Sequence, residues 1–591
     1  KMLIFSYSAD FSVILLEKYM KVKIFLAGLS LALVSCESMD LVPKSQGNTA
    51  SWYTNETELA LAANEFYILG YWQEPLNSSE QWCDNTTYRL QNRNPGSKGT
   101  ILDGTMNGQQ YEVYALWEQS YKLIARANTM LENIHKAEGN VAQSVIDRYT
   151  GEACFARACK YADLIFFYGD VPYLERTETI TEAEQKGRRP KEELIPLVYA
   201  DFDKAIEGLP VSYGQSAPVH FTKGAAMAMK ARFALYMGDY EMAEKSAKAC
   251  MDLGVYSLEP DYAKLFKQST KVNPEKVFVL PRSIENDVVL DSWIVKNGLP
   301  RNAGGYGSYN PSWDLLASYL CTDGLPIDES PLFDPRNPFK NRDPRCSMTI
   351  VAFNTEHCGF EYDPSPAATT IMNYTTGKTQ SNQDTRKVNQ YASYTGLLWK
   401  KGIDASWMEN GLKVEQDYII MRYADVLLMY AEAMIEQNKI DDSVLKAINM
   451  VRARAYGVDV SETSAYPAVK MGSQEELRKA VRIERRMEFA MENSRLQDLM
   501  RWKLASKALN GYNYIMLQPD DLLKNVVEKG LWFWGMTPQI DEDGLADFSA
   551  LFNAGYCTTG AKRSFPDREY LWPIPTHDME LCPNLTNNPG Y

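Results

Sequence analysis

The chain has 591 residues, of which 45% are hydrophobic and 23% are charged, and its formal net charge is −14 at neutral pH. These proportions are typical of a globular protein, and the length allows a large core. The excess of acidic residues argues against a nucleic-acid partner, because binding to nucleic acids depends on lysine and arginine neutralising phosphates. A neutral ligand fits this charge better.

The N-terminal segment has the features of a secretory leader. An apolar run at residues 24–34 follows Lys21 and Lys23. It is too short to cross a bilayer, which takes about 20 residues, but it fits the core of a signal peptide. We expect translation to begin at Met20, so that residues 1–35 comprise upstream sequence and a signal peptide.

The apolar run ends in LVSC, which resembles a bacterial lipobox, the motif whose cysteine is acylated and becomes the first mature residue. We therefore expect lipidation at Cys36, and two or three acyl chains hold a protein firmly on a membrane. The alternative is a cleaved signal, or a core helix, that ends at a chance cysteine. Residues 36–50 are polar, contain Pro43 and Gly47, and are expected to form a tether.

Helical periodicity dominates residues 51–280. Within the segment 111–136, Trp117, Ile124 and Asn128 fall on one stripe of a helix with 3.6 residues per turn. A buried amide at Asn128 requires a hydrogen-bond partner. We expect this segment to be one of several long helices.

Two later segments have the pattern of tetratricopeptide hairpins. Residues 225–254 read as two helices joined at Gly238 and Asp239, with small residues such as Ala231 that let the helices approach closely. Residues 423–455 repeat this pattern. The helical layer is therefore expected to be interrupted in sequence.

The interruption at residues 281–415 is rich in glycine, proline, asparagine and aromatic residues, which predicts loops and short strands. A segment this long without regular elements is usually functional, so we expect it to bind the ligand. Residues 416–510 are expected to be helical again and residues 511–591 to be loop-rich. The predicted fold is mainly α: a single large domain in which tetratricopeptide-like helix pairs form a scaffold for a loop-built surface.

Glu484 and Glu488 lie four residues apart on the apolar face of an expected helix that begins with a capping box at Ser473 and Glu476. Such a pair could bind a metal or act as acid and base. Buried carboxylates are also tolerated when guanidinium groups pair with them, and we favour this structural interpretation. The nearby candidates are Arg485, Arg486, Arg495 and Arg501.

No catalytic or metal-binding motif is present. None of the four histidines has the spacing of a metal site, and no nucleophile-elbow motif occurs. We therefore expect no catalytic residue, no metal and no cofactor. The ten cysteines are scattered, and we expect mostly buried thiols.

Aromatic residues make up 12% of the chain, and two loops combine them with polar side chains. An indole presents a flat apolar face to the C–H side of a sugar ring, while amides, carboxylates and arginine bond the ring hydroxyls. The alternative is that these rings pack the loops. The candidate ligand-binding residues are Trp82, Asp84, Asn85, Tyr88, Arg301, Asn302, Tyr306, Tyr309 and Trp313.

Seven segments, taken in order, resemble the SusD/RagB family of surface lipoproteins. They are GEACFARACKYADLIFFYGDVPY, DFDKAIEGLP, AMKARFALYMGDY, NRDPR, RYADVLLMYAEA, ERRMEFAMENSRLQDLMRW and YLWPIP. The resemblance implies a helical fold with tetratricopeptide-like pairs and a lipid anchor on the outer face of a Gram-negative outer membrane. It also implies capture of nutrient ligands, usually glycans, beside a SusC-like TonB-dependent transporter. The candidate ligand residues come from loop chemistry and not from these motifs.

We therefore expect a binding protein that captures an oligosaccharide and passes it to the transporter without catalysis. A second interpretation keeps the transporter partner but replaces the glycan with a peptide, as in RagB-like relatives. A third is a glycoside hydrolase with a carboxylate pair in an aromatic cleft, for which Asp84, Asp314 and Asp323 are the candidates.

Overall fold

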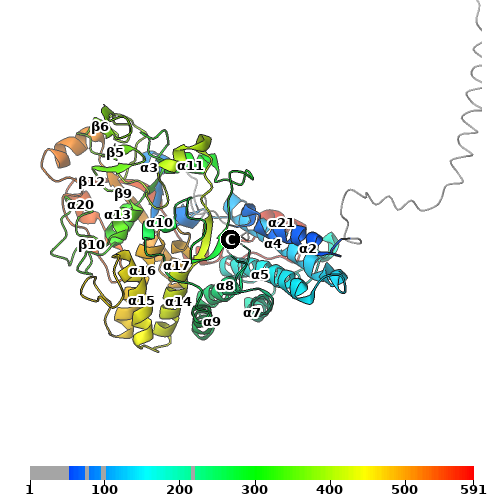
Figure 1. Ribbon diagram of the computed structural model, residues 1–591. Coiled ribbons are helices and arrows are strands. Elements are labelled where there is room, and N and C mark those ends of the chain that lie inside the picture. The colour runs from blue at the N-terminus through cyan, green and yellow to red at the C-terminus, as the bar shows by residue number, and fades with distance from the viewer. Residues whose placement is uncertain (1–51, 73–78, 95–100, 215–219) are drawn as a thin grey trace, which may run out of the picture. The chain divides into compact units, whose positions relative to one another are not determined.

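The computed structural model describes residues 52–72, 79–94, 101–214 and 220–591, and a compact unit spans Tyr53–Tyr591 (Figure 1). The predicted leader, the lipidation site Cys36 and the tether lie outside the described residues. None of the described helices is both long and apolar enough to cross a membrane. The compact unit is mainly α-helical with small antiparallel sheets, as predicted.

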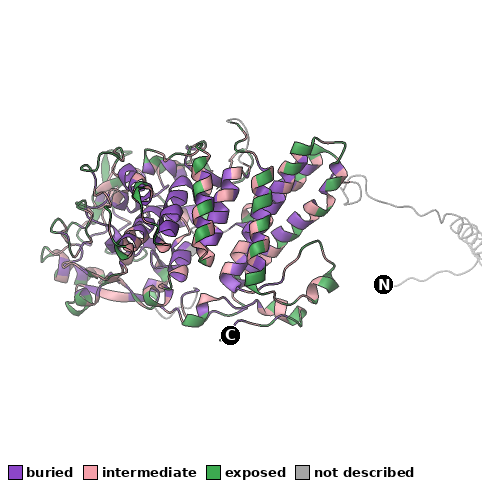
Figure 2. Cartoon of the chain, turned by 90° about the horizontal axis from the view of Figure 1, so that it is seen from below, coloured by how far each residue is buried: buried purple, intermediate pink, exposed green. Residues whose placement is uncertain are grey.

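Long helices follow one another through the N-terminal part and pack in sequence order, α4 on α5, α5 on α7, and α7 on α8. Several helices in Figure 2 have a buried face and an exposed face, as the 3.6-residue period requires for a helix at the surface. Helix α8 differs, because none of its residues is exposed, and α5 has no exposed residue after Asp147. The helices are α2 (Glu56–Asn64), α4 (Tyr111–Asn133), α5 (Gln143–Tyr168), α7 (Lys191–Gly208), α8 (Lys223–Met237) and α9 (Tyr240–Asp252).

The predicted buried amide on α4 is confirmed. The Asn128 side chain is 1% exposed, and its Nδ2 donates to the carbonyl oxygens of Leu174 at 2.9 Å and Arg176 at 3.1 Å. Its Oδ1 accepts from Nη1 of Arg157 at 2.8 Å. The amide therefore fastens α4 to α5 and to the loop that follows α5.

Both predicted hairpins are present. Gly238 ends α8 with a φ of 75°, a conformation that glycine adopts without strain, and the Asp239 side chain caps α9 by accepting from the Met242 N–H at 3.1 Å. The second hairpin consists of α14 (Tyr423–Glu436) and α15 (Asp442–Ala455). Since α14 packs against α9, the two hairpins join into one helical array although they are far apart in sequence (Figure 1).

Helix α16 (Gln474–Phe489) carries the paired carboxylates, and their structural interpretation is confirmed. Nη1 of Arg345 lies 2.7 Å from Glu484 and 2.8 Å from Glu488, and Nη1 of Arg422 lies 2.6 Å from Glu488. All of these groups are buried. The partners are not the arginines nearest in sequence, which instead bind the carboxylates of Asp84, Asp425, Glu432 and Asp498.

Short antiparallel strands connect distant parts of the chain. The pairs are β1 (Thr86–Tyr88) with β3 (Tyr309–Pro311), β2 (Lys276–Leu280) with β8 (Tyr418–Arg422), β9 (Gly511–Met516) with β12 (Cys557–Arg563), and β10 (Gln539–Ile540) with β11 (Ala546–Asp547). A four-stranded sheet contains β4 (Thr355–His357), β5 (Phe360–Tyr362), β6 (Thr370–Asn373) and β7 (Lys378–Ser381). The β1–β3 pairing brings both candidate ligand loops together.

The remaining helices are short. They are α3 (Arg89–Arg93), α6 (Ile180–Glu184), α10 (Tyr262–Leu265), α11 (Ser292–Gly298), α12 (Trp313–Ser318), α13 (Arg345–Thr349), α17 (Arg495–Arg501), α18 (Ala505–Ala508), α19 (Pro519–Leu522), α20 (Ser549–Asn553) and α21 (Thr576–Leu581).

Large aromatic rings fill the core of the loop-rich part. Trp313, Trp399, Trp407 and Trp534 belong to one hydrophobic cluster, and none of them is more than 2% exposed. Cysteines add to the cores as predicted: all nine in the described residues are unpaired, and eight are buried. Where long helix faces are missing, large rings supply the buried apolar area.

Candidate functional site

Both of the predicted binding tryptophans lie in the interior. Trp82 is 6% exposed, and its ring packs edge-on against Trp572 with the centroids 5.4 Å apart. Trp313 is 2% exposed, and its Nε1 donates to the carbonyl oxygen of Thr395 at 2.8 Å. The prediction that these two indoles face a ligand is wrong, because both are needed to fill the core beneath the loops.

Asp84 and Asn85 are also buried, so they are not available to a ligand as predicted. Both oxygens of Asp84 accept from Arg495 at 2.8 Å, and Nη2 of Arg486 lies 2.9 Å from Oδ2. Burial opposes ionisation, but these two guanidinium groups outweigh it and hold the pKa of the Asp84 carboxyl well below its usual range. Asn85 donates to Glu80 and accepts from Arg486. The pair fastens this loop to α16 and α17.

Tyr88 lies nearer the surface, whereas Tyr309 is buried, with 9% of its surface exposed. They are opposite each other in the β1–β3 pairing, with their ring centroids 5.1 Å apart. Tyr88 is half-buried, and the hydroxyl of Tyr309 lies close to the side chains of Trp293 and Gln81. These contacts connect the two predicted loops to α11.

Trp293 is a binding candidate that the sequence interpretation missed. It lies at the start of α11, where Asp291 caps the helix by accepting from the Trp293 N–H at 2.8 Å. Its side chain is 51% exposed, and its ring centroid lies 5.6 Å from that of Tyr306. Every other tryptophan in the part of the chain that the structure describes is buried or half-buried. The signal available in the sequence was Asp291, a residue type that often caps a helix, two residues before Trp293.

The loop between α11 and β3 holds Tyr306 in place through backbone contacts. The N–H of Tyr306 donates to the carbonyl oxygen of Lys296 at 2.5 Å, and the N–H of Gly307 donates to that of Leu299 at 3.0 Å. A Cβ atom at Gly305 would lie 2.2 Å from the Leu299 oxygen, so only glycine fits there. Tyr306 is therefore presented on a hydrogen-bonded turn.

Arg301 and Asn302 anchor this loop to a second one. Their backbone N–H groups donate to Asp384 at 2.8 and 3.0 Å, and Nδ2 of Asn302 donates to the same carboxylate at 2.7 Å. The Asn302 oxygen accepts from the Gln383 N–H at 3.1 Å. The Asn302 side chain therefore holds the two loops together. The Arg301 guanidinium contacts Tyr391, another ring that was not predicted.

We call the resulting surface the aromatic arc. Its rings come from β1, α11, β3 and the two loops described above, and they offer apolar faces, phenol hydroxyls and adjacent guanidinium groups. Such groups bind the C–H faces and hydroxyls of a sugar. The arc consists of the exposed or half-buried rings of Tyr88, Trp293, Tyr306 and Tyr391, together with the buried Tyr309 that supports them.

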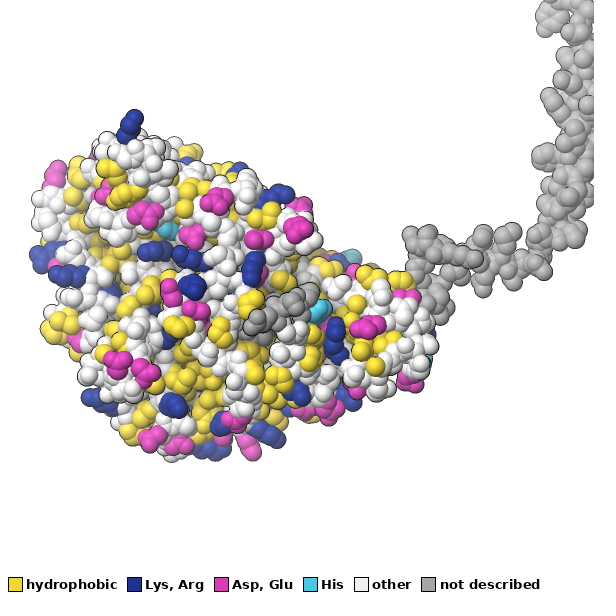
Figure 3. Space-filling view, in the orientation of Figure 1, with side chains coloured by type: hydrophobic (Ala, Val, Ile, Leu, Met, Phe, Trp, Pro, Cys, Tyr) yellow, Lys and Arg dark blue, Asp and Glu magenta, His cyan; other side chains and the backbone are white. Residues whose placement is uncertain are grey.

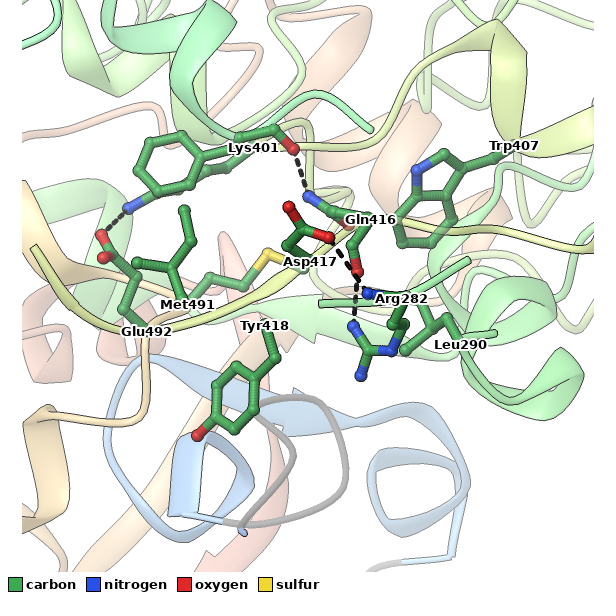
Figure 4. A pocket seen from close by; sticks show the side chains of 11 residues that line it. Arg282, Leu290, Lys401, Trp407, Gln416, Asp417, Tyr418, Met491 and Glu492 are labelled. Atoms are coloured by element: carbon green, nitrogen blue, oxygen red, sulfur yellow. Dashed lines mark hydrogen bonds and ion pairs between the residues drawn. The ribbon is translucent and has the colours of Figure 1, made fainter. Parts of the chain in front are cut away.

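A separate cavity of about 80 Å³ lies beside β8 (Figure 4). Its charged groups are paired within the chain: Lys401 binds Glu492, Asp417 accepts from the Arg282 N–H at 3.1 Å, and Arg282 donates to the Gln416 carbonyl at 2.6 Å. Burial lowers the pKa of Lys401 to about 8 although Glu492 opposes the shift. This cavity is best explained as a structural ion-pair site.

Comparison with protein families agrees with this architecture. The profile of the SusD family matches residues 274–591. A second profile, described as starch-binding and associating with the outer membrane, matches residues 57–235. Because the first match covers more than half of the chain, the chain belongs to the SusD family.

Individual relatives extend the match to nearly the whole chain. SusD-like protein P2 of Formosa agariphila is 24% identical over 603 residues and covers 97% of this chain and 100% of the relative. The crystal structure of a SusD-like carbohydrate-binding protein from Bacteroides fragilis is 27% identical, with a TM-score of 0.72 over 90% of this chain and 99% of that one. A laminarin-binding SusD-like protein, 20% identical, shares the fold with a TM-score of 0.58 and covers 91% and 100%.

Proposed function

We propose that this protein captures an oligosaccharide on the aromatic arc and passes it, uncleaved, to a SusC-like TonB-dependent transporter. The observation that carries this proposal is Trp293, a half-exposed indole that lies edge-on to Tyr306 at the capped start of α11. Tryptophan is normally mostly buried, and an exposed ring within an aromatic group marks a contact surface.

The chemistry of the arc suits a carbohydrate. Sugar rings present C–H groups on their faces and hydroxyls at their edges, and the arc pairs ring faces with donors such as the Arg301 guanidinium. The carbohydrate-binding relative from Bacteroides fragilis supports the same ligand class. We therefore assign residues 281–415, together with β1, to ligand binding.

Binding without turnover is supported by the carboxylates that the hydrolase interpretation requires. Two catalytic carboxylates must flank the scissile bond about 5 to 10 Å apart. Asp84 is bound by two arginines, Asp314 lies 3.1 Å from Arg563, and Asp323 accepts from Ser330 at 2.7 Å. Each candidate carboxylate is thus engaged within the chain.

The lipobox at Cys36 and the outer-membrane description of the matching N-terminal profile support a lipid-anchored position at the cell surface. Stacked helix pairs present broad protein-binding surfaces, so we assign the transporter contact to the helical array. Metabolic labelling with a fatty acid tests the anchor: the chain should be labelled, and Cys36→Ser should abolish the label. Label retained in the variant would contradict the assignment.

Titration calorimetry of the protein against panels of oligosaccharides and extended peptides tests the ligand class. We expect saturable binding of at least one glycan and, after prolonged incubation, no shorter product by chromatography. Binding of peptides alone would favour the RagB-like alternative, and release of shorter sugars would overturn the non-catalytic assignment.

A further inference from the structure

Three arginines surround one ring of the arc. The Cζ atoms of Arg93, Arg89 and Arg301 lie 4.8, 5.7 and 5.8 Å from the ring centroid of Tyr391. We call Arg89, Arg93 and Arg301 the arginine cluster. Each contact is within range of a cation–π interaction, but three cations on one ring also place like charges close together.

Two members of the cluster share their acceptors. Nη1 of Arg89 donates to the carbonyl oxygens of Tyr306 at 2.5 Å and Tyr391 at 2.8 Å, and Nη1 of Arg301 donates to the same two oxygens at 3.1 and 3.4 Å. The two guanidinium groups are therefore neighbours, and the acceptors that they share are neutral carbonyls. A fourth cation, Lys296, has its Nζ 6.0 Å from the Tyr306 ring centroid.

In the described part of the chain, carboxylates act on this cluster only at longer range and not as ion pairs. Among the described residues, no ion pair within 4.0 Å involves the cluster or Lys296, whereas Arg495 and Arg563 each have a carboxylate at 2.8 and 3.1 Å. Asp384 acts on Arg301 electrostatically, but its oxygens already accept from backbone and amide N–H groups of the neighbouring loop. Positive charge therefore accumulates beside the arc.

Arg89 and Arg301 each also have a buried donor without a partner. Arg89 is 8% exposed, and its Nε and that of Arg301 are buried without a hydrogen-bond partner. Burial lowers the pKa of Arg89, and the adjacent Arg301 lowers it further. An unmatched buried cation is unfavourable, and an anion bound beside the cluster relieves the repulsion between its members.

We propose that the ligand of the aromatic arc is an acidic oligosaccharide whose carboxylate or sulfate groups bind the arginine cluster. This inference rests on the proposed function and narrows it from sugars in general to anionic sugars. The net charge of −14 favours a neutral ligand, yet on the face drawn in Figure 3 cationic and anionic side chains are interspersed. We therefore expect the positive charge of the arginine cluster, and not the net charge of the chain, to determine which sugars bind.

Arginine is suited to this task because its planar fork matches the geometry of carboxylate and sulfate-like oxyanions with two parallel hydrogen bonds. Arg93 is exposed, its Nη2 donates to the Gln390 side chain at 3.3 Å, and its guanidinium lies over the Tyr391 ring. Its removal should leave the fold intact, whereas loss of Arg89 or Arg301 would also release the loops that they hold. Arg93 is therefore the residue to test.

The experiment compares matched ligands that differ only in charge. The full-length protein is titrated with an oligogalacturonate and its carboxyl-reduced neutral form, and with a sulfated carrageenan oligosaccharide and its desulfated form. We expect at least one acidic member to bind about tenfold more tightly than its neutral partner, and this preference to shrink at high salt because the charges are screened. The two pairs distinguish carboxylate from sulfate recognition.

Arg93→Gln should weaken binding of the acidic ligand about fivefold, as expected for one charge-assisted hydrogen bond. Arg126→Gln, at an exposed arginine on α4, is the matched control and should bind as the unmodified protein does. Equal affinity for the charged and neutral forms, or an unchanged affinity in Arg93→Gln, would overturn this inference but leave the glycan-binding function standing. Failure to bind any glycan would overturn both.

Discussion

Tyr88 and Tyr309 face each other across the β1–β3 pairing, with their ring centroids 5.1 Å apart. This contact joins a loop near the start of the described chain to one near its middle. Through Tyr309 and Trp293 it continues to α11, so the aromatic arc is assembled from separate segments on a fixed backbone. A ligand that spans these rings would meet a preformed surface.

The buried tryptophans should contribute to stability and not to binding. Trp313→Ala removes a large ring that packs against Phe533, Trp534 and Phe548, and such truncations cost about 3 to 5 kcal/mol of unfolding free energy. Urea denaturation measures the cost. Below the transition, the folded variant should bind glycan normally. A wild-type midpoint combined with lost binding would show that Trp313 contacts the ligand after all.

The ion network around Glu488 should be essential to the fold. Glu488→Gln leaves Arg345, Arg422 and Arg454 without a buried carboxylate that all three contact, and breaking such a network costs about 3 to 5 kcal/mol. Glu182→Gln, at an exposed carboxylate paired with Arg176, should change stability little. Thermal unfolding compares the two. If Glu488→Gln lowered the stability as little as Glu182→Gln, the buried network would add no stability.

Glu569 should make stability depend on pH. Burial raises the pKa of this carboxyl to about 7 despite the opposing charge of Arg568, so the folded state binds its proton more tightly than the unfolded state. The contribution of Glu569 to the unfolding free energy is fully present below about pH 4.5 and is lost as the pH rises through about 7. The loss is on the order of 3 kcal/mol. Glu569→Gln should remove this slope from unfolding measured between those values. If the variant kept the wild-type dependence of stability on pH, groups other than Glu569 would be its cause.

Much of the helical scaffold follows from local pattern. The Gly238 and Asp239 turn, the small residues between helices and the buried Asn128 amide are all visible in sequence, because each depends on neighbours within a few turns. The partners of Glu484 and Glu488 are not visible in the same way. Arg345 lies far away in sequence, and only the folded chain shows that it is closer than the neighbouring arginines.

The site was harder to predict because loop composition does not say which rings face inward. Trp82 and Trp313 occur among glycine and polar residues, as exposed rings do, yet tertiary packing buries both. Trp293 stands in an apolar run that reads as core, and its exposure depends on where α11 begins. The ligand-binding region could be recognised from composition, but the orientation of its rings could not.

The most direct test of the account is titration of the glycan ligand into Trp293→Ala, with Tyr111→Ala as the control. Tyr111 is an exposed ring at the start of α4, outside the arc. We predict that Trp293→Ala binds at least about tenfold more weakly, a loss of about 1.4 kcal/mol, with unchanged thermal stability, while Tyr111→Ala binds normally. Wild-type affinity in Trp293→Ala would contradict the central claim that the aromatic arc holds the sugar.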